Sequence, residues 1–118
     1  MGLRSEWRTC KAALEAAGLG TGVFTQDLSS ALRAFEDARD ALEAERTKTR
    51  RDPARIASRK AALNAACNAL APIAQQYWAT AHYLQTRGDT AAGQAAAKGA
   101  ADFLMRVVNE IHMIRQRG

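Results

Sequence analysis

The sequence has few of the residues that build strands, disulfide frameworks or membrane spans. It contains two prolines and two cysteines, and aromatic residues make up only 6% of the chain. Cys10 and Cys67 can form at most one bridge, which argues against a disulfide scaffold, and we expect two reduced, buried thiols. No apolar run approaches the roughly 20 residues of a membrane-spanning helix. The opening segment, MGLRSEWRTCK, lacks an apolar run suited to a signal peptide, so a cytoplasmic protein is expected.

Large apolar side chains are also scarce. The chain contains 27 alanines and only 27 residues that are Val, Ile, Leu, Met, Phe, Trp or Tyr. Alanine is the best helix former, and a core with so few large side chains requires helices that approach closely. Residues 1–118 are therefore predicted to form a single all-α domain. The richness in Ala and Arg further suggests a GC-rich bacterial or phage genome.

Apolar periodicity and helix-breaking residues divide the chain into four helices. We expect them at residues 5–17, 25–50, 53–87 and 91–118. Gly18 ends the first helix, and Asp52 with Pro53 opens the third. Pro72 lies inside the third helix and removes a backbone hydrogen bond, so a kink is expected there. The predicted fold is a four-helix bundle with a short first helix and a long, kinked third helix.

Positive charge is concentrated in one short segment. The stretch RTKTRRDPARIASRK, residues 46–60, contains seven basic residues and one acidic residue, whereas the whole chain has a net charge of +5. The basic residues are Arg46, Lys48, Arg50, Arg51, Arg55, Arg59 and Lys60. At the end of the second helix, cations complement the helix dipole. In the first turns of the third helix the dipole disfavours them, and we expect Arg55, Arg59 and Lys60 to have no acidic partner.

This segment predicts either a surface that binds an anionic partner or a hairpin tip surrounded by solvent. Arginine and lysine side chains neutralise nucleic-acid phosphates, so nucleic acid is the first candidate. The segment has no aromatic residue for base stacking and the chain has no zinc-finger, basic-zipper or RNP-type motif. The predicted contact would hold an RNA or DNA backbone without reading its sequence.

Two other regions suggest contacts with protein. Trp78 and Tyr83 lie partly off the apolar seam of the third helix, and such residues dominate interface energetics. In the fourth helix, Leu104 and Val108 widen the apolar surface beyond one stripe, which is typical of a helix buried on two sides. These four residues are predicted to contact another subunit or a second copy; for Trp78 and Tyr83 the simpler explanation is a helix core with polar-tipped aromatic residues.

The segment RVVNEIH resembles the Arg–five residues–His motif of the small helical HEPN ribonucleases. In that family the Arg and the His act on the RNA phosphate and the 2′-hydroxyl, so the resemblance implies these roles for Arg106 and His112. The residue after the Arg is commonly polar in that family, whereas here it is Val107.

The preferred hypothesis is a non-enzymatic subunit that holds a nucleic-acid backbone through the basic hairpin, as small subunits of RNA-guided (CRISPR) effector complexes do. The alternatives are a protein-only adaptor, of secretion, phage-structural or antitoxin-like type, and the HEPN-like ribonuclease. No cysteine or histidine pair has ligand spacing, so no metal site, cofactor or small-molecule substrate is predicted.

Overall fold

The computed structural model describes residues 2–20, 22, 24 and 27–117, and all regular secondary structure in this part of the chain is helical. The helices are α1 (Leu3–Ala16), α2 (Leu28–Arg46), α3 (Pro53–Arg87) and α4 (Ala91–Arg117). The predicted all-α four-helix bundle with a short first and a long third helix is confirmed. The expected start of the second helix, at residue 25, lies outside the described residues.

Two helix boundaries differ from the expected ones. α1 begins at Leu3, with Gly2 and not Ser5 before it. α2 ends at Arg46, so residues 47–52 form the loop to α3. Lys48, Arg50 and Arg51 are therefore loop residues beyond the C-cap Thr47 and not part of the last turn of α2.

The helix ends follow from local sequence. Gly18, at φ 82°, ends α1, where its N–H donates to the Glu15 carbonyl and the Leu19 N–H donates to the Leu14 carbonyl. Asp27 opens α2 by accepting a hydrogen bond from the Ser30 N–H at 3.0 Å, and its bonds with Ser30 lower the pKa of its carboxyl. The cap thus contributes fully above the ordinary pKa of 3.8 and is lost as the pH falls through the lowered value. α3 opens as predicted, with Asp52 accepting from the Ala54 N–H.

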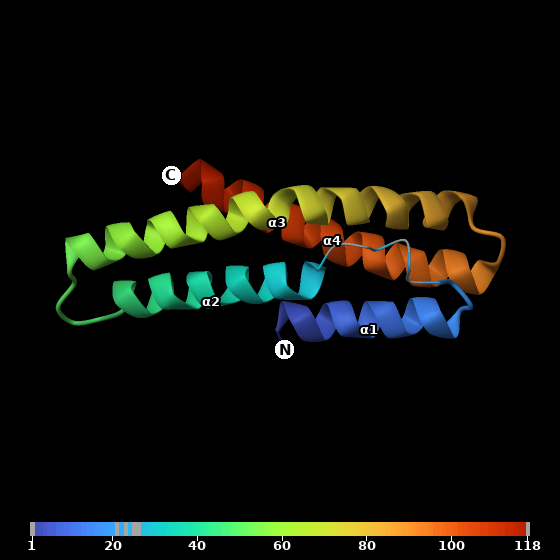
Figure 1. The fold of residues 1–118 in the computed structure, drawn as a ribbon, viewed down its shortest axis with the longest axis horizontal. Helices are drawn as coiled ribbons and strands as arrows, with labels where there is room; N and C mark the ends of the chain where they lie inside the picture. Colours follow the sequence, from blue (N-terminus) through green and yellow to red (C-terminus); the bar gives the residue numbers. More distant parts are fainter. Residues whose placement is uncertain (1, 21, 23, 25–26, 118) are drawn as a thin grey trace.

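The four helices form a rod (Figure 1). Its extents are 56 × 23 × 19 Å, and its radius of gyration of 16.3 Å exceeds the roughly 13.5 Å of a compact domain of this length. α1 and α2 follow one another along the same side of the rod, and α1 packs on α4 while α2 packs on α3. At most levels the rod consists of α3, α4 and one of the two shorter helices. α2 and α3 continue beyond the end of α4, and there the α2–α3 hairpin is alone.

The core changes character along the rod. Beside α1 it is aromatic: the Trp7 ring lies 5.5 Å from Phe24, 5.7 Å from Tyr77 and 6.3 Å from Phe103. Between α3 and α4 it consists largely of alanines that are almost completely buried, namely Ala71, Ala74, Ala81, Ala97, Ala100 and Ala101. These small side chains let the two helix backbones approach, as the composition predicted. Pro72 lies inside α3, which changes direction near its middle (Figure 1).

Candidate nucleic-acid interface

The predicted basic segment forms one end of the rod. We call it the basic tip, and define it as Arg46, Lys48, Arg50, Arg51, Arg55, Arg59 and Lys60. The end of α2, the connecting loop and the first turns of α3 hold these residues, and every one of them is exposed. The hairpin brings both sides of the sequence segment to the same end of the molecule, so the charge lies on one continuous structural element.

Sequence reasoning missed one residue that organises this tip. Glu45 is only 4% exposed, and its Oε1 lies 3.0 Å from Lys48 Nζ and 3.9 Å from Arg55 Nη1. Its Oε2 has no hydrogen-bond partner among the described residues. The expectation that Arg55 has no acidic partner is therefore wrong, because the partner comes from α2 and not from the helix that carries Arg55.

A signal for Glu45 was present in the sequence. The buried residues of α2 are Leu28, Leu32, Phe35, Leu42 and Glu45, so this carboxylate occupies the next inward position of the apolar stripe. An acidic residue at an inward position is expected to have a cationic partner, because burying a charge alone is costly. The hairpin supplies two such partners.

The other five cations of the tip remain without an ion pair in the described part of the chain. They are Arg46, Arg50, Arg51, Arg59 and Lys60. Of the ten Lys and Arg residues outside the tip, four have an ion pair in the described structure: Arg33, Arg39, Lys98 and Arg106. Arg39 Nη1 lies 2.7 Å from Glu110, and Lys98 Nζ lies 2.8 Å from Asp102. The expected lack of partners is thus found for Arg59 and Lys60 but not for Arg55.

The four predicted protein-contact residues lie in different environments. Leu104 is completely buried within the chain, so it is a core residue and offers no surface to a partner. Its burial explains the wide apolar surface of α4, which packs on both α1 and α3. Val108 and Trp78 are half-buried, and the Trp78 ring stacks on His82 at 5.0 Å. Tyr83 is 64% exposed, which makes it the most accessible of the four.

Arg106 and His112 are both exposed, but their side chains contact different residues. Arg106 Nη1 lies 3.4 Å from Glu6 of α1, and its guanidinium lies over the Phe103 ring. His112 instead borders a small hollow of about 170 Å³ that α3 lines with Ala71 and Gln75. Within the chain the two side chains therefore do not share a site.

The remaining chemistry-bearing groups give no second site. Cys10 and Cys67 are free thiols, and burial raises the pKa of each. Cys67 is buried as expected, whereas Cys10 is half-buried and its Sγ–H donates to the Gly99 carbonyl at 3.9 Å. Within the described ranges, no group of three or more His, Cys, Asp or Glu could hold a metal ion.

None of the four helices, as far as their residues are described, is long and apolar enough to cross a membrane. In comparisons with known proteins, no family model, curated protein or solved structure matches this chain.

Proposed function

We propose that the protein is a non-enzymatic subunit that holds the phosphate backbone of a nucleic acid at the basic tip. The observation that carries this proposal is the set of five exposed cations that have no ion pair with any described residue and are gathered at one end of the rod. Lys and Arg side chains that neutralise phosphates release counterions, which supplies affinity that falls steeply with salt.

The position of these cations supports a partner outside the chain. Arg59 and Lys60 lie in the second turn of α3, and the first turn contains no acidic residue to balance the like charges. Arg55 and Arg59, four residues apart, share one face of the helix; Glu45, 3.9 Å from Arg55, offsets part of this repulsion, but Arg59 has no ion pair in the described structure. A bound polyanion would relieve this repulsion.

The proposed contact is independent of base sequence. The basic tip contains no aromatic residue on which a base could stack, and phosphate contacts fix position without reading bases. A backbone-holding subunit of an RNA-guided effector complex would have this requirement, and the proposal extends to a bacterial, cytoplasmic assembly of that kind.

The experiment is a fluorescence-anisotropy titration with labelled single-stranded and duplex oligonucleotides across a salt series. It compares the native protein with Arg51→Glu/Arg59→Glu and with the control Arg8→Glu/Arg87→Glu. Both control residues are exposed arginines without an ion pair in the described structure, and neither belongs to the tip. Both variants therefore change the net charge equally.

We expect the tip variant to bind at least tenfold more weakly and the control to bind nearly as well as the native protein. The slope of log Kd against log salt should decrease by about 2 in the tip variant, since each lost phosphate contact contributes roughly 0.9. Equal weakening by both variants would show that only net charge matters, and would contradict a localised site.

A second candidate, the protein-only adaptor, is favoured by the outer face of α3. Between Ala61 and Thr86 this helix contains no Asp, Glu, Lys or Arg, yet many of its residues are exposed. An exposed helix face with no charged residue is more typical of a helix that is covered on that side. Ala65→Arg places a charge in the exposed part of this face. It should abolish a protein contact there and leave oligonucleotide binding intact. Co-sedimentation with the protein partner, compared between the native chain and the variant, tests this.

A further inference from the structure

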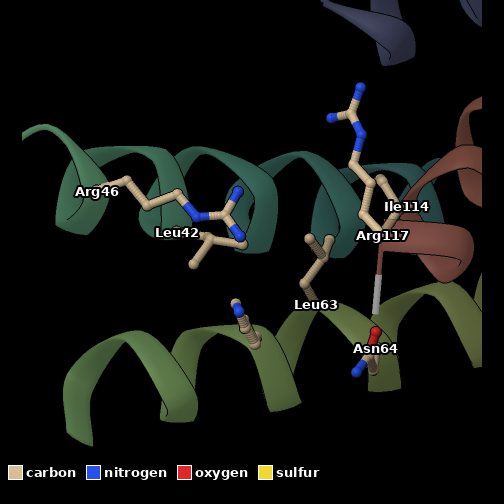
Figure 2. A pocket seen from close by; sticks show the side chains of 7 residues that line it. Leu42, Arg46, Leu63, Asn64, Ile114 and Arg117 are labelled. Carbon is tan, nitrogen blue, oxygen red and sulfur yellow. The ribbon is translucent and has the colours of Figure 1, made fainter. Parts of the chain in front are cut away.

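A groove lies beside the basic tip, at the place where α4 ends. We call it the α4-end groove. It has a volume of about 410 Å³, with a smaller hollow of about 60 Å³ adjoining it. Its apolar residues are Leu42 of α2, Leu63 of α3, and Met113 and Ile114 of α4. Figure 2 shows that Leu42 and Leu63 point into the space between α2 and α3, and that Ile114 approaches it from α4.

The apolar part of the groove is accessible at one side. Leu42 and Leu63, at its floor, are each 5% exposed and belong to the core. Met113 is 51% exposed, which makes it one of the most exposed large apolar side chains of the described structure. A flexible thioether at the edge of an apolar groove adapts its shape to a bound side chain.

The charged residues around the groove are predominantly positive. Arg46 and Arg117 border both hollows, and Lys60 borders the smaller one. Arg39 and Glu110 also line the groove, but they neutralise one another at 2.7 Å. Glu43 is the other carboxylate in the lining, so unpaired cations outnumber it. Electrostatic complementarity therefore favours an acidic occupant.

The shape of the rod indicates what kind of occupant fits. α4 ends at Arg117, while α3 extends from Leu63 back to Pro53, which is about 15 Å of helix at 1.5 Å per residue. Along this length α2 and α3 lack the third helix that covers them elsewhere (Figure 1). A helix laid over Leu42, Ile56 and Leu63 would give this part of the hairpin a third helix to pack against.

We propose that the α4-end groove binds an acidic amphipathic helix of a partner protein. This proposal goes beyond nucleic-acid binding at the tip, with which it shares Arg46 and Lys60. The apolar stripe of the partner helix would enter the groove, and its flanking carboxylates would pair with Arg46, Lys60 and Arg117. The mode is that of a helix in a groove, with apolar anchors one helical turn apart.

The probe is a fluorescein-labelled synthetic peptide in which leucines repeat at i, i+4 and i+7 and glutamates occupy the flanking positions. A scrambled peptide of the same composition has the same charge without the apolar stripe. We expect the native protein to bind the first peptide and to bind the scrambled one at least tenfold more weakly. Equal binding of the two peptides, or no binding of the first, would overturn the proposal.

Matched variants locate the binding. Arg117→Glu should weaken peptide binding about tenfold, because it reverses one rim charge. Met113→Glu should weaken it by a similar factor, whereas Met105→Glu, at an exposed methionine outside the groove, should not. Arg51→Glu/Arg59→Glu should leave peptide binding within about threefold, since neither residue lines the groove and both act on it mainly through screened charge. Loss of peptide binding in this last variant alone would assign the peptide to the tip and overturn the proposal.

Sedimentation of the native protein tests whether a second copy of the chain occupies the groove instead of a partner helix. A monomer in the absence of peptide is the expected result. A dimer that Met113→Glu dissociates would mean that a second copy of the chain fills the groove, and a partner helix would then be ruled out.

Discussion

The half of the rod beside α1 and the basic tip both contain part of the same helix, α3. The two regions differ in how many helices pack on α3 and in how fully their polar groups are hydrogen-bonded. Beside α1, α3 packs in a three-helix layer around Trp7, and the turn to α4 satisfies its own polar groups. There the Gly93 N–H donates to Thr90 Oγ1, and Gln94 Nε2 donates to the Gly88 carbonyl. At the tip, α2 is the only described helix that α3 meets, and the buried Glu45 carboxylate has one oxygen without a hydrogen bond from any described residue.

This contrast indicates that different regions of the molecule supply its folding stability and its binding surface. The α1 half contains the large aromatic side chains, whose burial supplies much of the folding free energy. The tip contributes little apolar burial and holds exposed cations that no internal contact requires. Because contacts within the chain do not explain these exposed cations, we assign them to the binding of a partner.

The largest expected effect is on stability. Trp7→Ala should lower the free energy of unfolding by about 3–5 kcal/mol, because it empties the centre of the aromatic cluster. Ile56→Ala, at a half-buried position of the tip, should cost less than about 2 kcal/mol. Urea denaturation followed by circular dichroism compares them. Similar losses for the two variants would mean that the tip is as integral to the core as the α1 half.

The next effect concerns the tight turn between α3 and α4. A Cβ at Gly88 would lie 2.5 Å from the Leu84 carbonyl oxygen, so Gly88→Ala must displace backbone and should cost about 1–3 kcal/mol. Gly20 has no atom within 4 Å of such a Cβ and its φ is not positive. Gly20→Ala should therefore be neutral or stabilise by up to about 1 kcal/mol. Thermal unfolding of the two variants measures the difference, and a Gly88→Ala protein as stable as the native one would contradict the close packing of this turn.

The smallest expected effect is on oligonucleotide affinity, and it tests whether Glu45 restrains the cations of the tip. Glu45→Gln should release Lys48 and Arg55 from their carboxylate and increase oligonucleotide affinity about threefold, since one unit charge at ~6 Å in water is worth ~0.7 kcal/mol. Glu43→Gln makes the same change in net charge at an exposed residue of α2 without an ion pair in the described structure. Anisotropy titrations at constant salt should show a smaller gain for this control. Equal gains would mean that Glu45 does not restrain the tip.

The sequence was sufficient for the fold because its signals are local. Alanine content, the Asp52–Pro53 start of α3 and Gly18 after α1 each act within a few residues, and the helices they predict are present. The end of α2 was harder to predict, because its apolar stripe fades before Arg46 and helix-forming residues continue into the loop.

The candidate site was predicted only in part, for a physical reason. The seven cations all lie within the fifteen residues 46–60, so their gathering at one tip needed no tertiary information. The pairing of Glu45 with Arg55 depends on the hairpin that brings α2 against α3, and the burial of Leu104 depends on α1 and α3 covering α4 from two sides. Such contacts between separate helices are not encoded in the spacing within either helix.

The most direct test of the account is amide chemical-shift mapping of the isotope-labelled protein during titration with a single-stranded oligonucleotide. The account predicts that the perturbed amides lie in residues 46–60, with little change in the turn between Arg87 and Ala91. Perturbations centred on that turn or on α1, with an unchanged tip, would contradict the assignment of the basic tip as the nucleic-acid surface.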